Sequence, residues 1–386
     1  MKRLFIASVF LVGFIELLIG CGGPTSSVGG TAGGSAPFLG AITMGPIVFE
    51  NGEIAKPSAI GLADGRVLCA YRDVSAADGK YVIYGQTGTS STAADPAQPN
   101  FAANPFDVSV HIVSNGHIVF AYGQGSDGVL EILSPAGSQI LGETVFEAGT
   151  TEDCSVVQVN DNTVFVFYKD MTDGGRGKFV RYQVNGTRLS AANPAQPVFE
   201  NGEVDFVRAI ALMDGNVAVV YRDSDDGGKG KFVVYDSSGN PVTAAEPNQL
   251  VFHDGNTQHV STSLAINGDF LIAYADGDSA NEGKAVVFNS SGTRTSLRMP
   301  DDPVFASRND GCAVVGLVNN GYLVAYTATG GHFVVLDSLG MVTQGAVQFD
   351  ALAGGRPSAC LLSNGKVAIA YGRGAGSAEG RLVIVE

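Results

Sequence analysis

Two aspartates, Asp107 and Asp153, occupy equivalent positions of an internal repeat, and paired carboxylates are the groups from which a general acid and a general base are made. His259 occupies the same position of a later repeat and adds a third titratable group. Because the repeat alone explains this spacing, the alternative is a solvated channel mouth whose charges balance. We therefore assign no catalytic residue from the sequence, and Asp107, Asp153 and His259 are candidates only.

Basic residues share this part of the repeat. Lys56 and Arg356 occupy the position of the two aspartates in the first and last repeats, and Arg208 lies two positions further along its own repeat. In a ring the first and last repeats are neighbours, so we expect a basic arc to face the acidic arc of Asp107 and Asp153. The three cations are predicted to bind a ligand by holding an anionic group or a saccharide.

Acidic, glycine-rich segments are candidates for binding a metal. Asp223, Asp225 and Asp226 lie close together, and carboxylate oxygens are ligands that calcium prefers. No segment has the spacing and terminal glutamate of an EF-hand, and Asp-Gly clusters are also typical of tight surface turns. Calcium at these three aspartates is one hypothesis and a surface turn is the other; no further cofactor is predicted.

Glycine, tyrosine and phenylalanine each recur at a fixed position when the repeats are aligned. These three columns of the alignment define the repeat positions of the residues described above. A repeat of about 50 residues indicates an architecture built from stacked or radially arranged units. Glycines nine residues apart are Gly79/Gly88, Gly128/Gly137, Gly177/Gly186, Gly230/Gly239, Gly283/Gly292 and Gly331/Gly340, with Gly380 opening a seventh repeat. The tyrosines are Tyr71, Tyr122, Tyr168, Tyr221, Tyr274, Tyr326 and Tyr371, and the phenylalanines are Phe49, Phe101, Phe146, Phe199, Phe252, Phe305 and Phe349.

Each repeat is predicted to contain four strands, because Asp-Gly and Asn-Gly pairs between apolar runs indicate hairpins. In the fourth repeat we expect strands at 207–212, 216–221, 231–235 and 242–252. The seventh repeat reaches only its third strand, and residues 38–49 form a spare strand that would complete it; the alternative is an open array. The predicted fold is all-β: a seven-bladed β-propeller of four-stranded antiparallel blades over residues 37–386, closed by the N-terminal strand in the last blade.

Charged residues also recur within the repeats. In six of the seven repeats a basic residue follows the opening glycine, and we expect it to pair with the aspartate two residues after the tyrosine, near the surface, where each pair contributes about 0 to 1 kcal/mol. A ligand-binding ring of cations is the alternative. The basic residues are Lys80, Lys178, Lys231, Lys284, His332 and Arg381, and the aspartates are Asp73, Asp170, Asp223 and Asp276.

The repeat pattern runs Leu-x-Asp/Asn-Gly, an apolar run, tyrosine, an acidic loop, glycine, a second apolar run and Asp-x-x-Gly. Over residues 37–386 it resembles the propeller repeats of secreted bacterial proteins. It lacks the Trp-Asp of WD repeats, the tryptophan of kelch repeats and the Ser-x-Asp-x-Gly-x-Thr-Trp box of sialidases.

The N-terminal residues form a separate module. Lys2 and Arg3 precede an apolar run that ends in Leu18-Ile19-Gly20-Cys21, which looks like a lipoprotein signal peptide over residues 1–20, with lipidation at Cys21. Ordinary signal cleavage nearby is the alternative. Residues 21–36 comprise that cysteine and a Gly/Ser/Thr-rich tether. We expect an exported protein, anchored in the outer membrane or at the cell surface.

The composition limits the classes of molecule that this chain is expected to bind. With 38 acidic and 23 basic residues, the chain has a formal net charge of -15 and no basic cluster, which argues against nucleic acid. Function on a repeat scaffold usually lies where loops vary, so we expect a monomeric, non-enzymatic module that binds a protein or a glycan at its loop face. The alternatives are a glycan-directed hydrolase or lyase that uses the channel-mouth carboxylates, and a calcium-stabilised structural protein.

Four cysteines remain besides Cys21. An exported protein permits disulfides, but Cys312 and Cys360, on neighbouring repeats, are out of step in the alignment. We therefore expect Cys69, Cys154, Cys312 and Cys360 to be buried free thiols, with a disulfide as the alternative.

Overall fold

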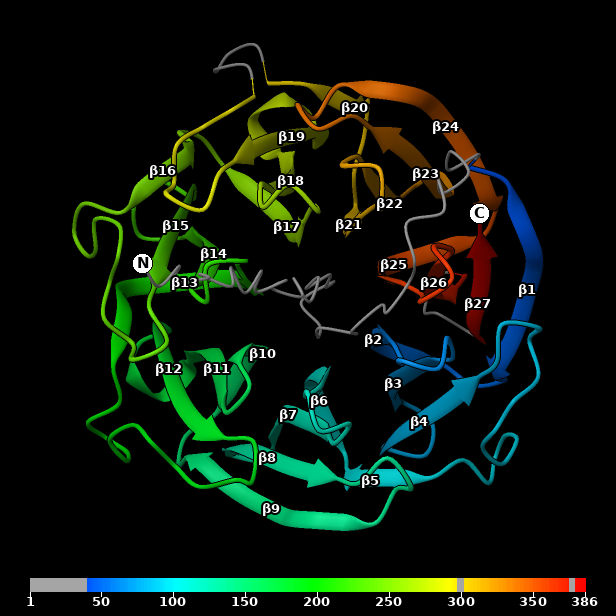
Figure 1. Ribbon diagram of the computed structural model, residues 1–386, viewed down its shortest axis with the longest axis horizontal. Helices are drawn as coiled ribbons and strands as arrows, with labels where there is room; N and C mark the ends of the chain where they lie inside the picture. Colours follow the sequence, from blue (N-terminus) through cyan, green and yellow to red (C-terminus); the bar gives the residue numbers. More distant parts are fainter. Residues whose placement is uncertain (1–39, 297–301, 375–378) are drawn as a thin grey trace, which may run out of the picture.

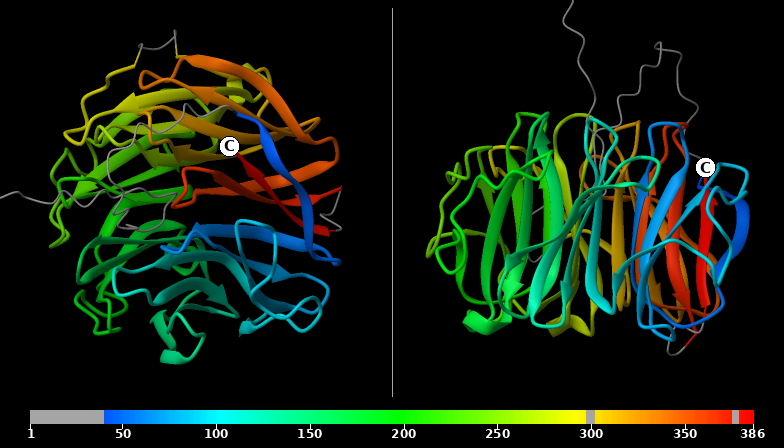
Figure 2. Two further views of the ribbon diagram at one scale, coloured as in Figure 1. Left: turned by 45° about the vertical axis from the view of Figure 1, so that its right-hand side comes forward. Right: turned by 90° about the horizontal axis from the view of Figure 1, so that it is seen from below.

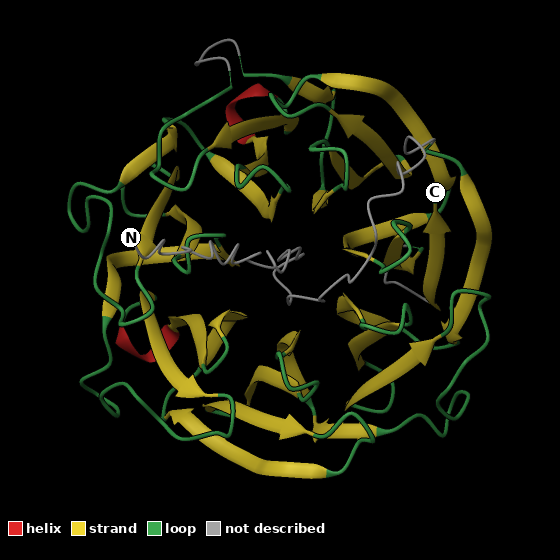
Figure 3. Cartoon of the chain, in the orientation of Figure 1, coloured by secondary structure: helices red, strands yellow, loops and turns green. Residues whose placement is uncertain are grey.

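The computed structural model describes residues 40–296, 302–374 and 379–386. It consists of antiparallel strands grouped into sheets around a central axis, with two short 3-10 helices, η1 (Met171–Asp173) and η2 (Gly277–Ser279), at the periphery (Figures 1 and 3). The all-β prediction is confirmed. The predicted signal peptide, Cys21 and the tether lie outside the described residues. Within the described part of the chain, no helix has the length and apolar character needed to cross a membrane.

The strands fall into four concentric sets. The innermost strands are β2 (Ile54–Gly61), β6 (Pro105–Ile112), β10 (Thr151–Asn160), β13 (Val198–Ala211), β17 (Thr257–Leu264), β21 (Gly311–Gly316) and β25 (Ala353–Leu361). Next come β3 (Val67–Asp73), β7 (Ile118–Gln124), β11 (Thr163–Asp170), β14 (Val217–Asp223), β18 (Phe270–Asp276), β22 (Tyr322–Ala328) and β26 (Val367–Arg373). The third set is β4 (Asp78–Tyr84), β8 (Asp127–Leu133), β12 (Arg176–Gln183), β15 (Lys229–Tyr235), β19 (Glu282–Phe288), β23 (Gly330–Leu336) and β27 (Glu379–Val385). The outer set is β1 (Ile42–Glu50), β5 (Asn100–Ala103), β9 (Gln139–Glu147), β16 (Leu250–His253), β20 (Val304–Ala306) and β24 (Val342–Asp350).

Hydrogen bonding joins the strands in order from the centre outwards. Among the described residues, five sheets have four strands and one has seven. In the seven-stranded sheet β13 pairs with β12 near its start and with β14 near its end, and so joins two groups of strands, β10 to β13 and β13 to β16, each of which is called a sheet below. The N-terminal strand β1 pairs antiparallel with β27, from Ile42 opposite Val385 to Glu50 opposite Gly380. The strand predicted to complete the last repeat therefore lies in the last sheet.

The sheets are arranged in a propeller-like ring. The strands run roughly along the ring axis (Figure 2). Each innermost strand contacts the innermost strand of the next sheet, and β25 contacts both β21 and β2, so these contacts lead back to the first sheet. The innermost strands thus surround the central channel (Figure 1).

The three sequence columns meet between neighbouring sheets. Each column phenylalanine packs against the tyrosine of the next sheet, with ring centroids 4.9 to 5.6 Å apart. A Cβ on the opening glycine would collide with the phenylalanine ring at each site, as at Gly380, where Phe49 from β1 lies. Because Phe49 also contacts Tyr71, the N-terminal strand β1 makes the same triad of contacts as the other outer strands.

The second glycine of each nine-residue interval has a different role. Its φ lies between 77° and 88°, in the left-handed region that a tight hairpin turn requires. None of the opening glycines has a positive φ. Glycine therefore recurs at this position because the phenylalanine ring approaches closely, and not because a turn requires it.

Two strands predicted in the fourth repeat are present with different bounds. The predicted strand 207–212 is the end of the longer β13, because the chain continues extended from the outer strand of one sheet into the inner strand of the next. The predicted strand 242–252 is only β16, Leu250–His253. Pro241 and Pro247 lie in the preceding segment and have no N–H to donate to a ladder.

Candidate functional site

The predicted site column lies at a bulge near the start of six innermost strands, whereas β21, which carries Gly311 of the column, pairs with β22 without a register shift. At the bulge the pairing with the second strand skips, for example between Ala55 and Ser58. Left-handed backbone at a residue other than glycine is strained by about 1 to 3 kcal/mol, and bulges re-aim side chains. The residues with positive φ at this position are Lys56 (44°), Asp107 (53°), Asp153 (48°), Phe206 (56°) and His259 (53°).

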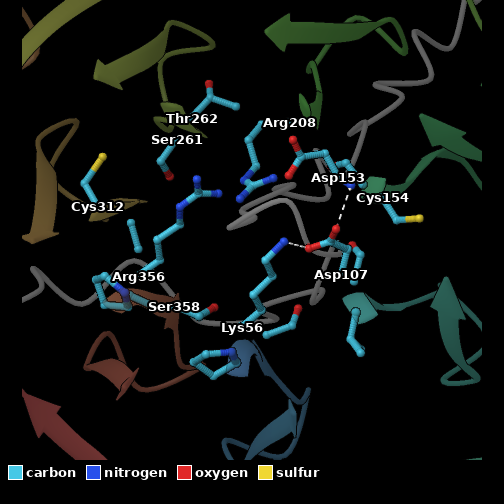
Figure 4. A pocket seen from close by; sticks show the side chains of 18 of the residues that line it. Lys56, Asp107, Asp153, Cys154, Arg208, Ser261, Thr262, Cys312, Arg356 and Ser358 are labelled. Atoms are coloured by element: carbon cyan, nitrogen blue, oxygen red, sulfur yellow. Dashed lines mark hydrogen bonds and ion pairs between the residues drawn. The ribbon is translucent and has the colours of Figure 1, made fainter. Parts of the chain in front are cut away.

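A cavity of about 130 Å³ lies at this end of the channel. The predicted residues Lys56, Asp107, Asp153, Arg208 and Arg356 all line it, as Figure 4 shows. The structure therefore brings both predicted carboxylates and all three predicted cations together. His259 is not among the lining residues; its ring lies 5.5 Å from that of Phe206, centroid to centroid.

Asp107 is held on both sides. One carboxylate oxygen forms an ion pair with Lys56, and the other accepts a hydrogen bond of 3.2 Å from the backbone N–H of Asp153 (Figure 4). The Asp107 side chain is 6% exposed, whereas Lys56 is 50% exposed and faces the solvent of the channel. The basic arc does not simply face the acidic arc, because Lys56 contacts Asp107 directly.

Asp153 repeats this contact one sheet further on. Its carboxylate accepts a hydrogen bond of 2.6 Å from the backbone N–H of Phe206. Burial acts to raise the pKa of Asp153, but Arg208, Arg356 and Lys56 outweigh burial and hold the pKa below its ordinary value. Asp153 is therefore ionised at neutral pH.

The two arginines meet in the middle of the channel. Their guanidinium groups point towards each other (Figure 4), and that of Arg356 lies over the ring of Phe206, 4.4 Å from its centroid. Burial and the positive charge of Arg208 lower the pKa of Arg356. Within the described residues, neither arginine forms an ion pair within 4.0 Å, so two like charges share this space without a directly bound carboxylate.

His259 differs from the other titratable candidates. Burial and the charge of Arg356 lower its pKa to about 4, so the imidazole is neutral at neutral pH. The backbone carbonyl of His259 accepts a hydrogen bond of 2.9 Å from the Cys312 thiol. Arg356 is the arginine that acts on His259, and a neutral imidazole near it adds no charge to the site.

Serines two positions after the bulge form a ring of contacts that our sequence analysis missed. Each serine hydroxyl accepts a hydrogen bond from a backbone N–H of the next sheet, at 2.9 to 3.2 Å. The serines are Ser58, Ser109, Ser155, Ser261 and Ser358. Ser358 bonds Ala59 and so links the last sheet to the first. The serines recur at one position of the repeat, but their hydrogen bonds depend on how neighbouring strands face each other, which the sequence does not show.

The recurrent lysine–aspartate pairs form as predicted, but the predicted location was wrong. Lys80 lies 2.6 Å from Asp73, and both side chains are 5% exposed. The same contact occurs in three further sheets, at Lys178–Asp170, Lys231–Asp223 and Lys284–Asp276. The pairs are buried because the second and third strands lie between neighbouring sheets. Breaking one would therefore cost more than the 0 to 1 kcal/mol of an exposed pair.

One of these pairs involves the candidate calcium ligands. The Lys231 ammonium lies 2.6 Å from Asp223 and 3.0 Å from Asp226, while Asp225 accepts a hydrogen bond from the N–H of Glu203. A calcium ion bound by Asp223 and Asp226 would have to displace this lysine. Calcium binding remains an untested prediction, and the geometry favours the surface-turn alternative.

The four cysteines are confirmed as buried free thiols: Cys69, Cys154, Cys312 and Cys360. Burial raises the pKa of each thiol, to about 11 for Cys312. They are therefore uncharged packing groups.

Comparison with known proteins identifies the fold. No family model and no curated protein sequence matches the chain. Among solved structures, it is similar to an ulvan lyase of polysaccharide lyase family PL25, bound to -[GlcA(1-4)Rha3S]-, with a TM-score of 0.57, 13% identity and coverage of 88% of this chain and 95% of that one. It is also similar to puromycin hydrolase, with a TM-score of 0.52, 15% identity and coverage of 88% of this chain and 53% of that one. At such identities the likeness establishes a shared propeller-like β-fold alone.

Proposed function

We propose that this chain is a seven-bladed, closed β-propeller that is exported, attached to the outer membrane through a lipid on Cys21, and binds an acidic glycan as a monomer without cleaving it. The pairing of β1 with β27 and the return of inner-strand contacts from β25 to β2 support a closed ring. Mass spectrometry of the N-terminal peptide tests the anchor, because a diacylglyceryl group on Cys21 gives a defined mass increase.

One observation supports an anionic ligand above all: the guanidinium groups of Arg208 and Arg356 point towards each other, and no carboxylate of the described residues forms an ion pair with either. Two like charges in a confined space repel each other, and a bound carboxylate or sulfate would relieve that repulsion while accepting charge-assisted hydrogen bonds from both. The Phe206 ring holds Arg356 in place. The fold shared with a polysaccharide lyase makes a glycan a reasonable bearer of the acidic group.

The carboxylates support binding rather than cleavage. Asp107 is engaged by Lys56 and Asp153 by the N–H of Phe206. Glycoside hydrolysis needs one protonated carboxyl to donate to the leaving group, whereas the pKa of Asp153 lies below its ordinary value. His259, with a pKa of about 4, is also unprotonated at neutral pH and so does not supply the acid of a hydrolase either. These groups therefore position the backbone and the cations.

Calorimetry with glucuronate, and glucose as the neutral control, tests the proposal on the mature chain from residue 21 with Cys21→Ser. We expect glucuronate to bind and glucose not to bind. Arg208→Gln and Arg356→Gln should each weaken glucuronate binding about tenfold or more, since a hydrogen bond to a charged group contributes about 1.5 to 3 kcal/mol. Arg66→Gln is the matched control, because Arg66 lies in the hairpin between β2 and β3 and pairs with Asp64. Unchanged affinity in both channel variants would contradict the proposal.

The enzymatic alternative predicts a different result. Incubation with an acidic polysaccharide would release reducing ends or unsaturated products, and Asp107→Asn or Asp153→Asn would abolish that release. We expect no product with the wild-type chain. Product formation that depends on either aspartate would replace the binding proposal with a hydrolase or lyase.

A further inference from the structure

A second cavity adjoins the channel mouth. It has a volume of about 380 Å³, within the range of small-ligand sites, and lies where β2, β3 and β6 approach the start of β10. Lys56 and Asp107 line both this side cavity and the channel cavity. Their ion pair therefore lies between the two cavities. A ligand long enough to pass over the ion pair would occupy both cavities.

An aromatic ring forms part of the side cavity. Phe106 is partly exposed there, and its cross-strand partner on β7 is Gly123. A Cβ at Gly123 would collide with the Phe106 ring, so the ring lies across the glycine backbone. An aromatic side chain held in this way presents apolar surface to the cavity, the kind of surface against which the C–H face of a sugar packs.

Polar groups surround this ring. Arg72 donates a hydrogen bond of 2.8 Å to Asn104, while its buried Nε has no hydrogen-bond partner within the described residues. Glu152 contributes an acceptor to the same lining. The two cations Lys56 and Arg72 are balanced by Asp107 and Glu152, so the side cavity has no net formal charge. It therefore differs from the channel cavity, where Arg208 and Arg356 lie together.

We propose that the side cavity is a subsite for an uncharged sugar ring, so that the ligand is an oligosaccharide in which an acidic unit is linked to a neutral one. This inference rests on the proposed function, because the acidic unit occupies the channel mouth. The neutral ring packs on Phe106, and its hydroxyls bind Arg72 and Glu152. Selection for alternating chains follows, since the carboxylate of a second acidic unit would have to leave water for a cavity whose lining has no net positive charge to offset that loss of hydration.

Two tetrasaccharides test this inference on the same mature chain. Hyaluronan tetrasaccharide alternates glucuronate with N-acetylglucosamine, whereas tetragalacturonate is acidic at every unit. We expect the wild-type chain to bind the hyaluronan fragment roughly tenfold more tightly than both tetragalacturonate and free glucuronate. Phe106→Leu should reduce that preference roughly two- to tenfold, the range of an aromatic contact.

Arg72→Gln and Glu152→Gln provide independent readouts should Phe106→Leu fail to fold. Each should reduce the preference for the alternating chain while leaving the affinity for free glucuronate unchanged. Arg66→Gln is again the control, since it removes an arginine near the opposite end of the same strand pair. Equal affinity of the wild-type chain for both tetrasaccharides, or an unchanged preference in all three variants, overturns the side-cavity subsite alone. Failure of glucuronate to bind the wild-type chain overturns the proposed function as well.

Discussion

The residues packed between neighbouring sheets and the residues at the rim of the channel both recur at fixed positions of the repeat. Only the packed residues keep the same residue type from one repeat to the next. Between the sheets, glycine, phenylalanine and tyrosine recur each time with the same ring contact, as in Gly380, Phe49 and Tyr71. At the rim, the equivalent position holds lysine in one sheet and aspartate in the next. Packing against a neighbouring sheet restricts the residue type, whereas a side chain that lines the channel is free to take on a binding role.

The largest effect should come from the layer between the sheets. Phe49→Ala removes a buried ring that contacts both Gly380 in the last sheet and Tyr71 in the first, and truncation of a buried phenylalanine costs about 3 to 5 kcal/mol. We expect the free energy of unfolding, measured in urea, to fall by that amount.

Phe101→Ala provides the matched comparison, because Phe101 makes the same contact with Tyr122 but belongs to a strand within the chain. Similar losses would show that the closing strand is bound as firmly as the others. A negligible loss for Phe49→Ala alone would mean that the ring is not closed by β1 in solution.

A smaller loss is expected at the serine ring, which lies between the two regions. Ser358→Ala leaves the N–H of Ala59 without its 2.9 Å acceptor at the junction of the last and first sheets. An unsatisfied buried donor costs about 1 to 3 kcal/mol. Urea unfolding measures the change, and Ser155→Ala, which affects Ala209 within the chain, is the control. A loss confined to Ser155→Ala would contradict the role of Ser358 at the closure.

Much of this arrangement could be predicted from the sequence because the residues that determine it recur once in each repeat. The glycine, tyrosine and phenylalanine columns place the strands, and the spare segment before Phe49 indicates a strand that β27 can pair with. The serine ring and the burial of Lys80 with Asp73 could not be predicted, since both depend on how neighbouring sheets face each other. The meeting of Arg208 with Arg356 depends on the reach of long side chains across the channel, which no spacing encodes.

The buried carboxyls of the layer between the sheets should make stability depend on pH. Burial, with Asp223 and Glu246 nearby, raises the pKa of Glu200 to about 7, against 4.5 ordinarily. The folded state then holds the proton more tightly than the unfolded chain does, so its contribution to stability is complete below pH 4.5 and is lost as the pH rises to about 7.

We expect this contribution to be at most about 3 kcal/mol, since each unit by which the pKa is raised corresponds to about 1.4 kcal/mol. Urea unfolding at several pH values between 4.5 and 8 measures it, and Glu200→Gln should flatten the part of the slope due to this group. Parallel slopes for the wild-type chain and the variant would show that Glu200 titrates normally.

The smallest change in stability is expected at the rim, where the effect on binding is largest. Arg356→Gln removes one of two like charges, so the free energy of unfolding should stay the same or rise by up to about 1 kcal/mol, in contrast to the loss for Phe49→Ala. The same variant should lose glucuronate affinity about tenfold, since the remaining Arg208 supplies only one guanidinium. Urea unfolding and calorimetry on one preparation measure both quantities. A large destabilisation would instead place Arg356 among the packing residues, and the loss of binding would then follow from unfolding rather than from the missing charge.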